Sequence, residues 1–357
     1  MDPLTHALSG ALLARATAGK TQQAPPPANS NPSTALPLKL RITAGFFAAL
    51  WPDLDFALRL IDTMTYLNWH QGPTHSLVLL PFWAWVVSVL LANIYRRYSW
   101  RLFFVPVCLG LAIHIAGDLI TSYGLMLFAP FSTERYSLPL VFVIDPWFSL
   151  MIIAGLIGSW LCPHQRLAAI AAFIGLTAYV AFLSTQNHKA HTVANSYIAA
   201  NLLTPDSVDV LPQPLSPYHW KLIIQQHDRY HIALVHLNKS EPTNRNADGW
   251  FISQIAAAYN PVSVESWQQR NRFGNNHEQD NAVRNAWMQP AFESFREFSV
   301  FPVLASVDNT NENLCYWFYD LRFEFPELPP SFQYGICWQP HLSQWVMQRH
   351  RGVFYID

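Results

Sequence analysis

Histidine and aspartate residues recur at short spacings in the N-terminal half, in segments that interrupt an otherwise apolar sequence. His114 and Asp118 are four residues apart, so on a helix they share one face, about one turn apart. Two metal ligands can then come from one rigid element, with further ligands from its neighbours. The other polar segments are Asp2-Pro-Leu-Thr-His6, Pro52-Asp-Leu-Asp55, His70-Gln-Gly-Pro-Thr-His75-Ser76, Thr121-Ser-Tyr-Gly124 and Asp145-Pro146.

These side chains predict a site for a divalent metal ion. Imidazole and carboxylate ligands without thiolate suit Zn, Mn or Fe, and Mg is possible where carboxylates dominate, so we expect zinc with manganese or iron as alternatives. The four cysteines are widely spaced and form no CxxC pair, which argues against a thiolate site. A divalent cation also compensates carboxylates that are costly to bury. The predicted metal ligands are His6, Asp53, His75, His114 and Asp118.

A metal with an open coordination position lowers the pKa of its bound water to about 7 and polarises a phosphoryl or carbonyl oxygen, which is the equipment of a hydrolase. A carboxylate that is not a ligand, Asp55 or Asp53, or the imidazole of His70, would be the general base. We assign the catalytic roles to Asp55 and His70.

Simpler interpretations of these residues remain open. His6 is also compatible with a capping or surface residue, and Asp145 with the N-cap of a helix that starts at Pro146. His114 and Asp118 could form a hydrogen-bonded pair without metal, as part of a proton relay. The segment from Thr121 is expected to let the chain turn out of its helix.

Apolar stretches separate these segments. Crossing a bilayer takes about 20 residues, and we predict four spans, at residues 76–94, 102–120, 148–161 and 167–184. Two shorter runs, 4–16 and 40–50, are predicted to be helices packed against the bundle. Residues 21–37, rich in Pro, Asn and Ser, are predicted to be a loop.

Basic residues mark one end of these elements, and the His/Asp segments mark the other. By the positive-inside rule the basic ends face the cytoplasm. The polar segments therefore converge on one side of the bundle, whichever absolute orientation holds. The basic residues are Arg15, Lys20, Lys39, Arg41, Arg96, Arg97, Arg101 and Arg166.

Composition agrees with a membrane region. Hydrophobic residues make up 51% and charged residues 13% of the 357 residues, whereas soluble proteins average about 25% charged residues. The net charge of −1 offers no basic field for nucleic acid, so no nucleic-acid partner is expected. Membrane lipids and a small or lipid-like substrate are the expected partners.

The composition becomes more polar after residue 184, and we predict a separate extramembrane α+β domain at residues 185–357. The fold class is thus mixed: a membrane-embedded helical domain, residues 1–184, followed by a soluble domain on the outer side. Cys315 and Cys337 either pair in an oxidising compartment or remain reduced core thiols. The predicted strands are 221–224, 231–237, 321–325 and 352–356, and residues 266–298 are predicted to be partly helical.

One set of motifs resembles a known family: Asp2, Thr5-His6, Pro52-Asp53-Leu54-Asp55, His70-x4-His75-Ser76, His114-x3-Asp118-x2-Thr121-x2-Gly124 and Pro130. In this order, over roughly residues 1–185, the motifs resemble the YdjM-like family, the LexA-regulated inner-membrane proteins predicted to be metal-dependent hydrolases. The resemblance implies a multi-pass protein of the bacterial inner membrane with hydrolytic activity, and it supplies no substrate. Gln71 departs from the pattern, since an arginine is common there in the family.

A looser likeness exists to zinc-dependent phospholipase C and the single-strand-specific zinc nucleases, which also combine an N-terminal His with a His-x3-Asp helix pair. It implies phosphoester hydrolysis with one or two metals. We therefore expect a metal-dependent hydrolase of a phosphoester or ester in a lipid-like or amphiphilic substrate. The alternatives are a proton or ion relay, and a membrane anchor whose C-terminal domain mediates binding.

Overall fold

The protein, analysed as a computed structural model, forms two compact units, Met1–Thr185 and Gln186–Asp357. The structure describes residues 1–19, 35–162, 166–241, 250–262, 267–275, 280–309 and 314–350. Most of the predicted loop at 21–37 and the predicted strand at 352–356 lie outside these residues.

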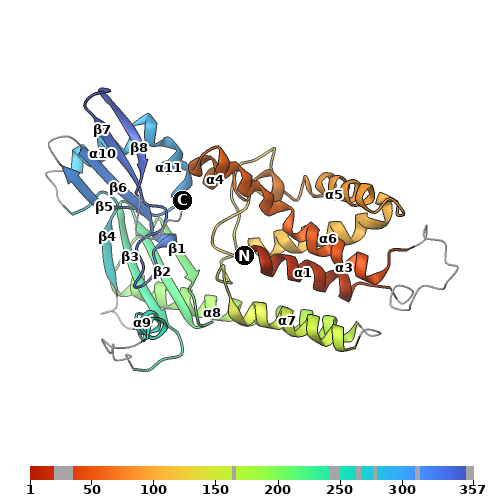
Figure 1. The fold of residues 1–357 in the computed structure, drawn as a ribbon. Coiled ribbons are helices and arrows are strands. Elements are labelled where there is room, and N and C mark those ends of the chain that lie inside the picture. Colours follow the sequence, from red (N-terminus) through yellow and green to blue (C-terminus); the bar gives the residue numbers. More distant parts are fainter. Residues whose placement is uncertain are drawn as a thin grey trace. The chain divides into compact units, whose positions relative to one another are not determined.

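The N-terminal unit is helical (Figure 1). The predictions for residues 4–16 and 40–50 are confirmed by α1 and α3. Short helices that the apolar runs did not indicate connect α3 to α5. The elements are α1 (Pro3–Ala16), α3 (Leu38–Leu50), η1 (Pro52–Leu60), α4 (Thr63–Trp69), η2 (Pro73–His75), α5 (Leu80–Ile94), α6 (Trp100–Leu119), α7 (Pro146–Leu161) and the first part of α8 (Leu167–Ala200).

Four membrane spans are not confirmed. Among the described residues, α6 and α8 are long and apolar enough to cross a membrane, and the pair Thr63–His75 and Leu80–Ile94, bent by 85°, would make a third. Helix α7 is apolar but has only 16 residues. The helix in the first predicted span, 76–94, begins only at Leu80, because Pro81 lies in the first turn of α5. Helix α8 runs past the predicted end at 184, since no Gly or Pro follows Gly175 until Pro205.

Glycines let three helices approach closely where they carry the polar segments. A Cβ atom at Gly10 of α1 would lie 2.3 Å from the carbonyl oxygen of Gly45 in α3, and one at Gly45 would lie 2.5 Å from that of Gly10. A Cβ atom at Gly110 of α6 would lie 2.8 Å from the same Gly45 oxygen. Such small-residue contacts bring helix backbones together in membranes. They hold His6, one turn before Gly10, close to His114, one turn after Gly110.

The C-terminal unit contains two antiparallel sheets, in the orders β1-β2-β3-β4 and β5-β6-β7-β8. One face of the first sheet packs on the second half of α8 through Ala190, Ala194 and Tyr197. The strands are β1 (Ser207–Pro212), β2 (His219–Gln226), β3 (Arg229–His236), β4 (Gln268–Asn271), β5 (Pro302–Asn309), β6 (Leu314–Asp320), β7 (Tyr334–Gln339) and β8 (Gln344–Arg349); the helices are α9 (Phe251–Ala257), α10 (Asp280–Trp287), η4 (Pro290–Phe292), α11 (Glu293–Phe298) and η5 (Leu321–Phe323).

The strand predictions for 221–224 and 231–237 are confirmed, and the one for 321–325 is wrong. That segment begins with the short helix η5, because the Asp320 carboxylate accepts the backbone N–H of Arg322 and turns the chain. The helical prediction for 266–298 is confirmed in part by α10 and α11. Cys315 and Cys337, paired across β6 and β7, form a disulfide.

The glycine contacts give a test of the bundle. Gly45→Ala places a methyl group against the Gly10 backbone, and overpacking of this kind costs about 1–3 kcal/mol. We expect a clearly lower thermal unfolding temperature in detergent, measured by circular dichroism. Gly175→Ala in α8 is the matched control, because its Cβ atom would meet nothing within 4 Å. Equal melting temperatures for the two variants would contradict the packing described.

Candidate metal centre

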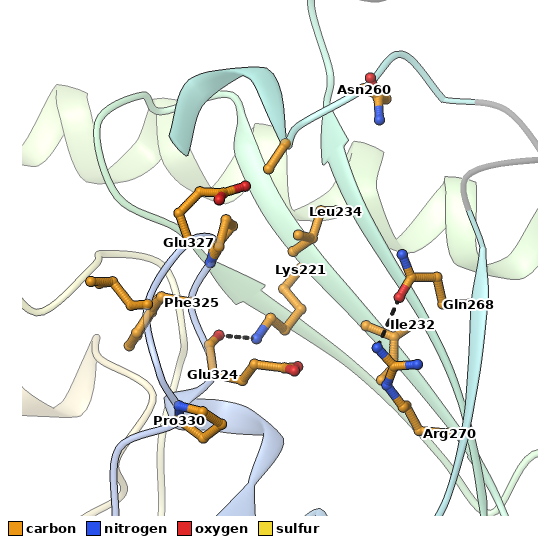
Figure 2. A pocket seen from close by; sticks show the side chains of 13 residues that line it. Lys221, Ile232, Leu234, Asn260, Gln268, Arg270, Glu324, Phe325, Glu327 and Pro330 are labelled. Carbon is orange, nitrogen blue, oxygen red and sulfur yellow. Dashed lines mark hydrogen bonds between the residues drawn. The ribbon is translucent and has the colours of Figure 1, made fainter. Parts of the chain in front are cut away.

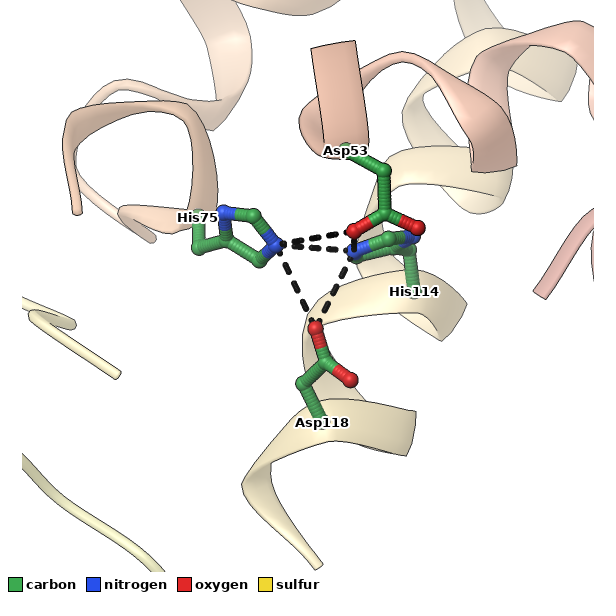
Figure 3. A group of neighbouring side chains, drawn as sticks. All are labelled: Asp53, His75, His114 and Asp118. Carbon is green, nitrogen blue, oxygen red and sulfur yellow. Dashed lines mark hydrogen bonds and ion pairs between the residues drawn. The ribbon is translucent and has the colours of Figure 1, made fainter. Parts of the chain in front are cut away.

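Four side chains from three elements meet at one point (Figure 3). Asp53 comes from the first turn of η1, His75 ends η2, and His114 and Asp118 lie one turn apart on α6. One ligand atom of each lies within 4.8 Å of those of the other three. Both histidine side chains are fully buried, and Asp118 is 1% and Asp53 16% exposed.

The distances between these atoms match the size of a metal ion. The two Nε2 atoms of His75 and His114 are 2.9 Å apart, and each lies 3.2 Å from Oδ2 of Asp118. Oδ1 of Asp53 lies 3.8 Å from Nε2 of His75 and 3.6 Å from that of His114. Four ligands at zinc-like bond lengths in a tetrahedron lie about 3.3 Å from one another. The group is therefore compact enough to hold one ion.

Hydrogen bonds outside the group fix the imidazole tautomers. Nδ1 of His114 lies 2.7 Å from the carbonyl oxygen of Ala49, which can only accept, so this nitrogen carries the proton. The Thr74 hydroxyl donates to Asp55 at 3.2 Å, so its oxygen accepts the proton of His75 Nδ1 at 2.9 Å. With the rings neutral, both Nε2 atoms would present lone pairs to the centre, an arrangement typical of metal-bound histidines.

With both rings neutral, the centre collects acceptors without a donor. Two imidazole lone pairs and two carboxylates face one another, and the buried atoms Oδ2 of Asp53 and Oδ2 of Asp118 have no hydrogen-bond partner. Buried polar atoms are nearly always paired, and unpaired carboxylates are especially costly. A divalent cation satisfies all of them at once, so the residues present fit a metal ion.

His6 lies behind this group and is not one of the four. Its Nε2 is 2.9 Å from Oδ1 of Asp118, the carboxylate oxygen that also contacts the Met1 ammonium. Its ring stacks on that of His114, with centroids 3.8 Å apart. His6 therefore orients both an imidazole and a carboxylate of the centre.

Asp55 and His70 form a second layer on the other side. The Asp55 carboxylate accepts hydrogen bonds from Nδ1 of His70 at 2.8 Å, the backbone N–H of Gln71 at 3.1 Å and the hydroxyl of Thr74. His70 is 16% exposed, and its ring centroid is 5.8 Å from that of His75. Both predicted catalytic residues thus lie beside the centre, and Asp55 is already occupied as an acceptor.

Three contacts were missed by sequence reasoning. Thr74 lies within the segment His70–Ser76, but no role was predicted for it. The Ala49 contact is made by a backbone carbonyl, which no side-chain pattern can indicate. The guanidinium of Arg135 donates to the carbonyl oxygens of Asn68, His70 and Gly124, and so fixes the segment that carries His70. The alternative interpretation of Asp145 is confirmed, since it caps α7.

A different cavity, of about 440 Å³, lies in the C-terminal unit (Figure 2). The buried Lys221 ammonium donates there to the backbone oxygens of Leu321 and Glu324, and burial lowers the pKa of Lys221 to about 8. These bonds tie the segment after β6 to the first sheet. Lysine, arginine and glutamate side chains line the cavity, and no histidine or aspartate is among its lining residues.

Comparison with known proteins covers the half of the chain that holds the centre. Residues 1–190 match the family described as YdjM inner membrane protein, which confirms the resemblance seen in the motifs. The uncharacterized protein YfhP of Bacillus subtilis (strain 168) is 25% identical over 179 residues, 50% of this chain and 52% of that protein. The chain thus spans about half the length of the curated relative it matches. No solved structure matches.

Metal content tests the centre directly. The purified protein should hold about one equivalent of a divalent transition metal, since the four ligands of one group suit one ion. His114→Ala and Asp118→Asn should each lose the metal, because either change removes one of its four candidate ligands. His188→Ala and Asp62→Asn are controls that change the same residue types elsewhere. Elemental analysis that finds full metal content in the first two variants would refute the ligand assignment.

Proposed function

We propose, from the premise that the chain belongs to the YdjM family of inner membrane proteins, that its N-terminal unit is a metal-dependent hydrolase. The observation that carries the proposal is the buried group of acceptor atoms without a donor, at Asp53, His75, His114 and Asp118. The substrate is a phosphoester or ester of a lipid-like or amphiphilic molecule, because the centre is built among membrane helices.

The donor set favours zinc, with manganese or iron as alternatives, since it combines imidazole and carboxylate without thiolate. A divalent cation held there supplies a lowered pKa for water and a positive charge that polarises a phosphoryl or carbonyl oxygen. The protein contributes fixed ligand positions. Ala49 and Thr74 hold the imidazole rings, and His6 holds Asp118.

His70 is the better candidate for the general base. Its Nδ1 proton is engaged by Asp55, so Nε2 carries the free lone pair, and the ring is partly exposed. Asp55 accepts three hydrogen bonds within the protein, so its oxygens are already engaged. In this mechanism Asp55 orients His70 and stabilises its imidazolium, and His70 takes the proton from the attacking water.

The C-terminal unit and the centre are assigned to the outer side of the membrane. Basic residues such as Arg96 and Arg101 lie at the other ends of α5 and α6, which by the positive-inside rule are cytoplasmic. The disulfide between Cys315 and Cys337 supports the same orientation, because disulfides persist in oxidising compartments.

The main alternative is a proton relay. The chain His70–Asp55–Thr74–His75 is continuous in hydrogen bonds and could pass a proton. A relay needs no metal, whereas a hydrolase of this design loses all activity without one. Removal of the metal with a chelator, and restoration by zinc, therefore separates the two functions.

His70→Ala should separate catalysis from metal binding. Loss of a general base lowers kcat by roughly 10²–10⁴-fold, while the four ligands remain, so metal content should be unchanged. The measurement is release of phosphate or fatty acid from phospholipid vesicles beside elemental analysis, with His188→Ala as the matched control. If His70→Ala loses its metal, the residue is a ligand; if its kcat is unchanged, it is not the base.

A further inference from the structure

A pocket of about 530 Å³ lies between η1 and α4, directly beside the centre. Its walls are Leu54, Ala57 and Leu58 from η1, with Trp69 and Pro73 from the chain leading to His75. The exposed surface is almost entirely carbon. The pocket is thus an open, hydrocarbon-lined hollow on the N-terminal unit.

The hydroxyl and carboxyl groups in the lining are bonded within the protein. The Thr65 hydroxyl donates to the carboxylate of Asp62, and the Thr74 hydroxyl donates to that of Asp55. Among the lining residues, Asp55 alone is ionisable, and its carboxylate already accepts three hydrogen bonds. The pocket therefore has little to offer a charged headgroup, and its apolar walls suit a hydrocarbon chain.

The inner end of the pocket coincides with the second layer of the centre. Asp55 and Thr74, which line it, also hold His70 and His75. Beyond the lining residue Leu58, η1 ends at Leu60, and Leu60 and Ile61 are 90% and 73% exposed. The same element therefore carries pocket residues beside the centre and an exposed apolar end.

We propose that this pocket binds an acyl chain of the substrate and places the ester or phosphoester group at its inner end, next to His70. The proposal rests on the hydrolase function proposed above and adds the substrate class: a lipid with a long hydrocarbon chain. Each methylene group that leaves water for the pocket adds to the favourable binding free energy. Chain length should therefore determine how well a substrate is used.

The first test measures occupancy without catalysis. A phosphatidic acid with a diazirine at the end of its acyl chain is photolysed with the metal-free protein in nanodiscs, and labelled peptides are identified by mass spectrometry. Label on residues 54–73 should exceed label on α7, whose exposed Leu150 and Ile157 report ordinary lipid contact. Ala57→Trp, which fills the pocket, should lower that ratio by about fivefold or more.

The matched control is Ala178→Trp, the same change at an exposed alanine of α8. It should leave the ratio unaltered. Equal labelling of η1 and α7 in the unmodified protein would overturn the proposed acyl-chain site, and so would the absence of any effect of Ala57→Trp. The apolar walls would then be in ordinary contact with bilayer lipid or with a second copy of the chain.

The second test uses hydrolysis of dioleoyl and dibutyryl phosphatidic acid by the metal-loaded protein. Ala57→Trp should lower kcat/KM for the long-chain substrate about tenfold relative to the short-chain one, and Ala178→Trp should not. Activity on both lipids without chain preference would refute the acyl pocket alone. Selective labelling of the pocket without hydrolysis of either lipid would refute the hydrolase and leave a lipid-binding site.

Discussion

The N-terminal unit is organised around a buried group of two carboxylates and two imidazoles, in which two carboxylate oxygens have no hydrogen-bond partner. Asp53, His75, His114 and Asp118 turn lone pairs toward one buried point, and none of them brings a proton to it. The Met1 ammonium compensates Asp118 from one side, and a cation at the centre would compensate the carboxylates from the other. The hydrogen bonds behind the candidate ligands hold both imidazole rings in place, so the geometry of the protein itself keeps these four side chains grouped as a candidate cation site.

That geometry depends on backbone contacts as much as on side chains. Gly10, Gly45 and Gly110 allow α1, α3 and α6 to touch through carbonyl oxygens, and His114 takes its tautomer from the carbonyl of Ala49 in the neighbouring helix. Pro52 ends α3 shortly after that carbonyl and starts η1, which carries Asp53. The end of α3 therefore positions two candidate ligands: the Ala49 carbonyl orients His114, and Pro52 begins the helix that carries Asp53.

The sequence was sufficient to predict which segments meet, because i,i+4 spacing and the positions of the arginines are properties of single elements. It could not predict which side chains in these segments would contact one another. His6 was predicted to be a ligand, and its Nε2 lies beside Oδ1 of Asp118; Asp55 was predicted to be a base, and its carboxylate accepts three hydrogen bonds. Both sets of contacts join distant segments of the chain. The prediction of four spans is not confirmed for a related reason, since apolar length alone does not show where a helix begins and ends: α5 begins only at Leu80 and α7 has 16 residues.

One short element, η1, presents Asp53 to the centre and Leu54 to the adjoining pocket, in consecutive residues. A ligand that shifts η1 from either side therefore alters the other. By thermodynamic linkage, the factor by which a pocket ligand changes cation affinity equals the factor by which the cation changes the affinity for that ligand. If the pocket holds an acyl chain as proposed, the binding of lipid and the retention of the cation would be linked through η1.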